Sequence, residues 1–68
     1  MVNKNKLRAE IVKNGYTQAD VAKKLDMSEK TFISRVKKSA FKTSEVEVMV
    51  DFLGIEDPAP IFFDREVT

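Results

Sequence analysis

The chain has 68 residues, which is enough for one small domain with a modest hydrophobic core. It contains neither Cys nor His, which excludes a disulfide framework and an ordinary zinc site, and removes a common catalytic nucleophile and the common general base. No apolar run approaches the roughly 20 residues of a membrane span, and the polar first residues are unlike a signal peptide. We therefore expect a soluble intracellular protein that is not an enzyme and has no metal, cofactor or membrane partner.

The net charge of +1 hides a strong separation of charge along the chain. Residues 1–42 carry eleven Lys or Arg against four acids, a net of +7, whereas residues 43–68 carry one Arg against seven acids, a net of −6. The separation indicates an anionic partner for the basic part, and the alternative is that these charges only solubilise the surface. The first interpretation, an anionic partner, is favoured because the excess of Lys and Arg coincides with residues 17–38, which also have the pattern of two short helices joined by a turn.

Helical spacing predicts a first helix over residues 3–14. Asn3 or Asn5 can cap its start, and Gly15 suits the left-handed position at its end. Its inward-facing residues are Leu7 and Ile11. We expect Tyr16 to pack against Val21 of the next helix.

Residues 17–38 have the pattern of two short helices joined by a tight turn. Thr17 can cap the first with Asp20 as its capping-box partner, and Ser28 can cap the second after a break at Asp26. The inward-facing residues are Val21, Ala22, Leu25, Phe32 and Val36, and the outward-facing ones are Lys30, Thr31, Ser34 and Lys37. A short turn and a polar, partly basic second helix describe a helix-turn-helix.

A further helix is predicted from Ser44, which forms a capping box with Glu47, to a stop at Gly54. The alternating residues Val46, Val48, Val50 and Phe52 also fit a strand. The capping box and the terminal Gly favour the helix. Its apolar surface is wider than one core face needs, which indicates contact with another chain.

The loop over residues 38–43 contains Phe41, which we expect to plug into the core. After Gly54, Asp57 can cap a short helix that has Pro58 at its first position. At least two of Ile61, Phe62 and Phe63 should be buried, and the last four or five residues should be frayed.

Several residues carry a resemblance to a known family: Thr17-Gln18, Val21-Ala22, Leu25, Met27-Ser28 and Phe32 match the motif of the phage Cro/repressor (XRE-type) helix-turn-helix family. The Asp-Pro and Ile-Phe-Phe near the end of the chain are also similar to small phage Cro repressors. The chain departs from the family at Asp26, where Gly is usual, and at Arg35 and Val36, since the usual apolar residue falls one place late.

The resemblance implies an all-α, compact four- to five-helix, lambda-repressor-like DNA-binding domain. It implies a phage or prophage transcriptional repressor in the bacterial cytoplasm, which binds double-stranded DNA as a homodimer on a two-fold operator without a small-molecule ligand. The alternative function is a protein-interaction module that modulates a partner repressor without reading DNA itself.

Carried over by position, the resemblance implies that bases are read by Ser28, Glu29, Lys30, Ile33 and Ser34. Lys30 can donate to guanine, Glu29 can accept from cytosine, and Ile33 can contact a thymine methyl. Two alternatives stay open: Glu29 can simply be a favourable charge at a helix N-terminus, and Ile33 can pack inward beside Phe32.

Phosphate contacts are predicted at the basic and polar positions Asn14, Gln18, Lys37, Lys38, Lys42, Thr43 and Ser44, the last at an exposed helix N-terminus. Arg35 can contact phosphate or pair with an acid of the C-terminal helix. The predicted dimer surface lies within residues 44–63 and consists of Val48, Phe52, Ile55, Ile61, Phe62 and Phe63.

Overall fold

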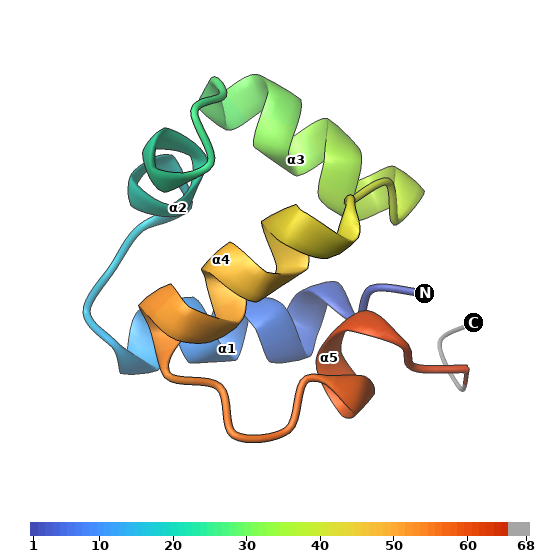
Figure 1. Cartoon of the computed structure of the whole chain (residues 1–68). Helices are drawn as coiled ribbons and strands as arrows, with labels where there is room; N and C mark the ends of the chain where they lie inside the picture. The colour runs from blue at the N-terminus through green and yellow to red at the C-terminus, as the bar shows by residue number, and fades with distance from the viewer. Residues whose placement is uncertain (66–68) are drawn as a thin grey trace.

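The computed structural model describes residues 1–65, which contain five helices and no strand (Figure 1). The helices are α1 (Lys4–Lys13), α2 (Gln18–Lys24), α3 (Glu29–Lys38), α4 (Thr43–Leu53) and α5 (Ala59–Phe62). The prediction of an all-α domain is confirmed, and residues 44–53 are helical rather than a strand. Within residues 1–65, none of the helices combines the length and the apolar character that a membrane crossing requires.

A single core receives side chains from all five helices. Helix α2 packs against α3, and α1 packs against both α2 and α5. The buried residues are Val2, Leu7, Ile11, Val21, Ala22, Phe32, Met49, Leu53, Ile55, Ile61 and Phe62. Phe41 packs against this core from the α3–α4 loop as predicted, with its ring centroid 5.9 Å from that of Phe32.

The helix starts follow the predicted caps where the capping contacts are local. The Thr17 hydroxyl accepts from the Asp20 amide at 3.1 Å, and the Asp20 carboxylate accepts from the Thr17 amide at 2.8 Å. Asn3 caps α1 and Ser28 caps α3, each through a side-chain oxygen. Gly15 ends the α1 turn at φ 77°, a backbone conformation that glycine adopts without strain.

The start of α4 differs from the prediction. The helix begins at Thr43 with Lys42 as its N-cap, and the Glu45 carboxylate accepts from the Lys42 amide at 2.8 Å. The predicted capping box of Ser44 with Glu47 is therefore wrong. The physical reason is tertiary, because Arg35 of α3 binds the Glu45 carboxylate at 3.2 Å and stabilises Glu45 at the third helical position.

The ends of the described chain lie side by side (Figure 1). The Asp64 amide donates to the Met1 carbonyl at 3.0 Å, and the Asn3 side chain donates to the Asp64 carboxylate at 2.9 Å. Asp64 is thus held, and the expected fraying does not begin there; residues 66–68 of that prediction lie outside the described residues. Helix α5 begins at Ala59, one residue later than predicted, and the Asp57 carboxylate accepts from the Ala59 amide at 3.2 Å.

Candidate nucleic-acid interface

The turn between α2 and α3 determines which face of α3 is exposed. Asp26 adopts φ 60° in this turn, and the Met27 amide donates to the Ala22 carbonyl at 3.0 Å. Phe32, only 1% exposed, then anchors the inner face of α3 in the core. The opposite face of α3 must therefore point to solvent.

That outer face is polar and basic. Lys30, Ser34 and Lys38 follow one another at a spacing of four residues, with Lys37 beside them, so they lie along one side of the helix. The three lysines are exposed, and Ser34 is half-buried between them. We call these four residues the outer face of α3. The predicted base-reading residues Lys30 and Ser34 are thus brought together, whereas Glu29, at the first position of the helix, lies nearer the flank that carries Ile33.

Ser28 and Ile33, also predicted to read bases, lie at the edges of this face. The Ser28 hydroxyl accepts from the Thr31 amide at 3.1 Å and donates to the Thr31 hydroxyl at 2.9 Å, so its hydrogen-bonding capacity is largely used in capping α3. Ile33 is 47% exposed and lies on the flank of α3 that faces α1, where it lines a groove together with Phe32. Val36 is half-buried and packs against the core.

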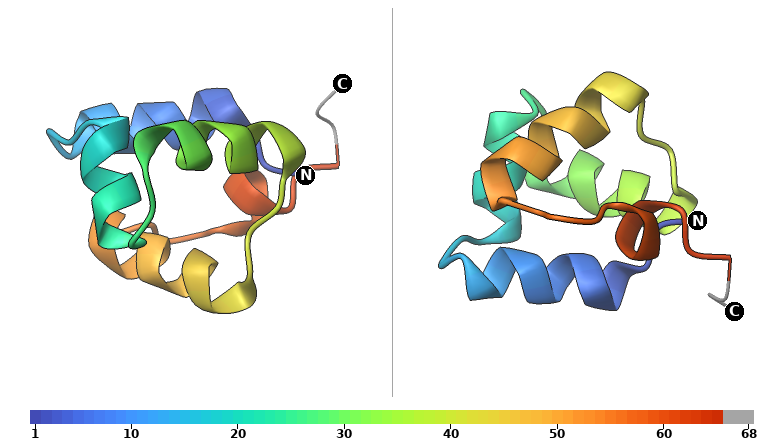
Figure 2. Two further views of the ribbon diagram at one scale, coloured as in Figure 1. Left: turned by 90° about the horizontal axis from the view of Figure 1, so that it is seen from above. Right: turned by 60° about the horizontal axis from the view of Figure 1, so that its bottom comes forward.

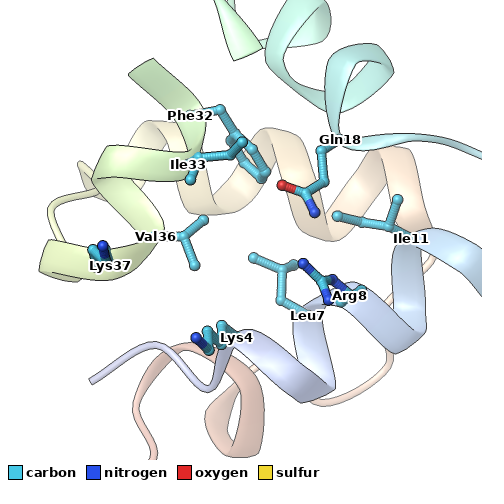
Figure 3. Close-up of a pocket in the computed structure, with 9 residues that line it drawn as sticks. All are labelled: Lys4, Leu7, Arg8, Ile11, Gln18, Phe32, Ile33, Val36 and Lys37. Carbon is cyan, nitrogen blue, oxygen red and sulfur yellow. The ribbon is translucent and has the colours of Figure 1, made fainter. Parts of the chain in front are cut away.

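A groove of about 120 Å³ separates α3 from α1 (Figure 3). Its rim carries Lys4 and Arg8 of α1 and Lys37 of α3, and the Gln18 amide points into it. The floor is apolar and is formed by Leu7, Ile11, Phe32, Ile33 and Val36. We call this feature the α1–α3 groove. Lys4 and Arg8 extend the positive surface beside the outer face of α3, and neither was predicted from the sequence.

The predicted phosphate-contacting residues separate into two groups. Lys37, Lys38, Lys42, Thr43 and Ser44 are exposed, and Gln18 is half-buried at the first residue of α2. Ser44 occupies the second position of α4 rather than its cap, so the exposed N-terminus of this helix is formed by Lys42 and Thr43. Its first turn leaves backbone N–H groups without intrahelical partners, which suits an anion.

Asn14 has a structural role instead. Its side-chain amide donates to the Glu10 carbonyl at 2.7 Å and to the Leu53 carbonyl at 2.9 Å, which ties the end of α1 to the end of α4. Because the amide nitrogen has two hydrogens, no side-chain donor remains for a phosphate. Arg35 pairs with Glu45 at 3.2 Å, which confirms its predicted alternative of pairing with an acid of the C-terminal helix.

The predicted dimer surface does not form one patch. Ile55, Ile61 and Phe62 are buried in the core of the single chain, so assigning them to a subunit interface was wrong. Phe52 is half-buried, and its ring stacks on that of Tyr16, with the ring centroids 4.3 Å apart. Val48 and Phe63 remain exposed at 36% and 62%.

Val48 and Phe63 lie on opposite flanks of α4. Phe63 lines a shallow groove with Val46, Val50 and Pro58, whereas Val48 is two residues from Val46 and therefore lies on the far side of the helix. The right view of Figure 2 shows α4 covering one side of the domain, with the chain leading to α5 running below it. A flat two-fold contact can therefore be centred on one of these residues but not on both.

Comparisons with protein-family models, with curated proteins and with solved structures give no match to this chain. The site is therefore defined by its geometry. That geometry is a helix with a buried aromatic anchor and an exposed basic outer face, flanked by further cations on α1 and at the start of α4.

Proposed function

We propose that this chain is a sequence-specific double-stranded-DNA-binding protein in which α2 and α3 act as a helix-turn-helix. Its activity is that of a Cro-like transcriptional repressor of a phage or prophage, in a lambda-repressor-like domain. The observation that carries the proposal is the outer face of α3, which presents three exposed lysines while Phe32 holds the opposite face in the core. The resemblance of residues 17–38 to the Cro/repressor motif supports the same function.

The α3 helix has the dimensions and polarity to enter a major groove. Glu29 and Lys30 stand in its first turn, where base edges are reached, and Lys30 is the donor suited to guanine O6 and N7. Ile33, with its partly exposed side chain, suits a thymine methyl on the side of the helix nearer α1. Each of these contacts discriminates between bases.

Phosphate contacts come from both sides of α3. Gln18, Lys4 and Arg8 lie on the α1 side, while Lys42 and Thr43 lie at the start of α4. Lys37 and Lys38 complete the positive surface at the end of α3. These groups fix the position of α3 on the duplex without reading its sequence.

One domain of this size makes few base contacts, so we propose that two copies act together on a two-fold operator. With Ile55, Ile61 and Phe62 in the core, the exposed residues left for a symmetric contact are Phe63 on one flank of α4 and Val48 on the other. Sedimentation in the presence of a selected duplex tests this, and a complex of one protein chain per two-fold site contradicts it.

The test of DNA reading compares two lysines of α3. After selection of a binding site from randomised duplexes, Lys30→Ala should relax the preference at one base pair and cost about 1–3 kcal/mol of discrimination. Lys38→Ala should weaken binding to all duplexes similarly and lower the slope of log K against log salt by about one. Lys13→Ala, on α1 away from the groove, is the control and should leave both quantities unchanged.

Absence of binding to any duplex at low salt and micromolar protein contradicts the proposal. It would favour the alternative function, a module that modulates a partner repressor through protein contacts. Equal loss of affinity for all sequences in both Lys30→Ala and Lys38→Ala would show that α3 binds DNA without reading bases.

A further inference from the structure

The α1–α3 groove has a composition that DNA binding leaves partly unexplained. A phosphate group needs the cations of the rim, which are Lys4, Arg8 and Lys37. It has no use for the apolar floor between them, which consists of five large side chains. An apolar floor under a cationic rim suits one large apolar side chain that is accompanied by carboxylates.

The size of the groove limits what can enter it. A cavity of about 150 Å³ lined by Leu, Ile and Phe accommodates benzene. The α1–α3 groove, of about 120 Å³ and open to solvent on one side, can therefore receive one aromatic ring but not a long acyl chain. The occupant is a single anchoring side chain.

The same chain exposes such an anchor on its acidic half. Phe63 is 62% exposed, the largest exposure of any aromatic side chain in residues 1–65. It lies beside Glu47 and Asp51 of α4, which line the same shallow groove. An exposed aromatic ring flanked by carboxylates complements an apolar groove flanked by Lys and Arg.

We propose that the α1–α3 groove is a docking site for a second copy of this chain, which inserts Phe63 and brings Glu47 and Asp51 towards Lys4, Arg8 and Lys37. The contact joins unlike surfaces, so each bound copy still offers one free groove and one free Phe63. Such head-to-tail contacts continue into longer assemblies or close into rings, in contrast to a two-fold contact, which stops at a dimer.

This contact also regulates the reading surface, a consequence that rests on the proposed function. Gln18, Ile33 and Lys37 belong both to the groove and to the surface that would meet DNA. A docked copy and a duplex then exclude each other. Self-association at high protein concentration would withdraw α3 from DNA, and operator DNA would release the docked copy.

The experiment measures sedimentation of the full chain without DNA, from about 10 µM to about 1 mM protein, a range that detects weak contacts. The wild type should associate beyond a dimer or as a closed ring at low salt, and less as salt rises. Phe63→Ala, which removes the anchor, and Ile33→Glu, which places an acid at the groove, should each weaken association by about tenfold or more. Val12→Ala, exposed on α1 and outside the groove, is the matched control and should associate like the wild type.

Mixing the two variants is the decisive step. Phe63→Ala keeps an intact groove and Ile33→Glu keeps an intact Phe63, so a mixture should form a 1:1 complex that stops there, although neither variant associates alone. If Ile33→Glu does not fold, Arg8→Glu at the rim replaces it. A wild type that stays monomeric to about 1 mM, or one that stops at a dimer and gives no complex on mixing, overturns the proposal. Because DNA is absent, these outcomes are independent of whether the chain binds a duplex.

Discussion

Residues 1–42 and residues 43–65 contribute side chains to one core but present different surfaces. In the basic part, apolar residues at helical spacing are buried, and the lysines predicted to face outward on α3 are exposed. In the acidic part, three apolar residues predicted to meet a second chain are buried within the same chain. Spacing therefore identifies the side chains that are buried away from water, but it does not identify whether the same chain or a second chain covers them.

The largest effect on the free energy of unfolding is expected at Phe32, a core residue of the basic part. Phe32→Ala should lower the free energy of unfolding by about 3–5 kcal/mol, because it empties the site of a side chain that is 1% exposed. Phe63→Ala, an exposed Phe in the acidic part, should change it by less than about 0.5 kcal/mol. Urea unfolding followed by circular dichroism measures both. Similar losses in the two variants would show that Phe63 belongs to the core.

A smaller effect is expected at the ion pair that links the two parts. Arg35→Gln, Glu45→Gln and the double variant form a cycle in which the glutamine oxygen can still accept from the Lys42 amide. Because the Arg35 side chain is 36% exposed, we expect a coupling of only about 0.5–1 kcal/mol.

The control pair is Glu10 with Lys13, both on α1 and 3.4 Å apart. Its Lys side chain is 69% exposed, and its coupling from the same unfolding measurements should be about 0.3 kcal/mol or less. Equal coupling energies for the two pairs would show that the ion pair of Arg35 with Glu45 does not hold the basic and acidic parts together.

The smallest effect is expected in the turn before α3. Asp26→Gly should raise the free energy of unfolding by about 0.5 kcal/mol, because Asp26 has φ 60° and glycine adopts this conformation without a steric cost. Ser39 has φ 53° as well, but its hydroxyl oxygen accepts from the Val2 amide at 2.9 Å. Ser39→Gly should therefore be neutral or destabilising. Destabilisation by Asp26→Gly would mean that the Asp side chain supports the turn.

Local signals in the sequence were sufficient for most of the fold. The caps at Thr17 and Ser28 and the break at Asp26 depend on neighbours within four residues, so the bounds of α2 and α3 could be predicted. The start of α4 could not be predicted, because it depends on the ion pair between Arg35 of α3 and Glu45 of α4. Contacts between different helices decide such details.

The candidate site was predictable to a similar extent. The outer face of α3 follows from helical spacing, and its lysines are exposed as expected. Lys4 and Arg8 were missed because only the packing of α1 beside α3 brings them to the same groove as Gln18. The available signal was that Lys4 and Arg8 are four residues apart and flank the inward-facing Leu7, which places both at the edge of the buried face of α1. Asn14 was assigned to phosphate contact because no local pattern reveals that its side-chain amide donates to the Leu53 carbonyl.

The most direct test of the proposed function asks which part of the chain meets DNA. Amide chemical shifts of the labelled full chain would be recorded during titration with a selected duplex at low salt, with a single strand of the same sequence as the control. We predict that the largest changes fall on Gln18, on residues 28–38 and on residues 42–44, while residues 46–57 change little. No change on addition of duplex, or changes confined to the acidic residues of α4 and the segment after it, would contradict DNA reading by α3.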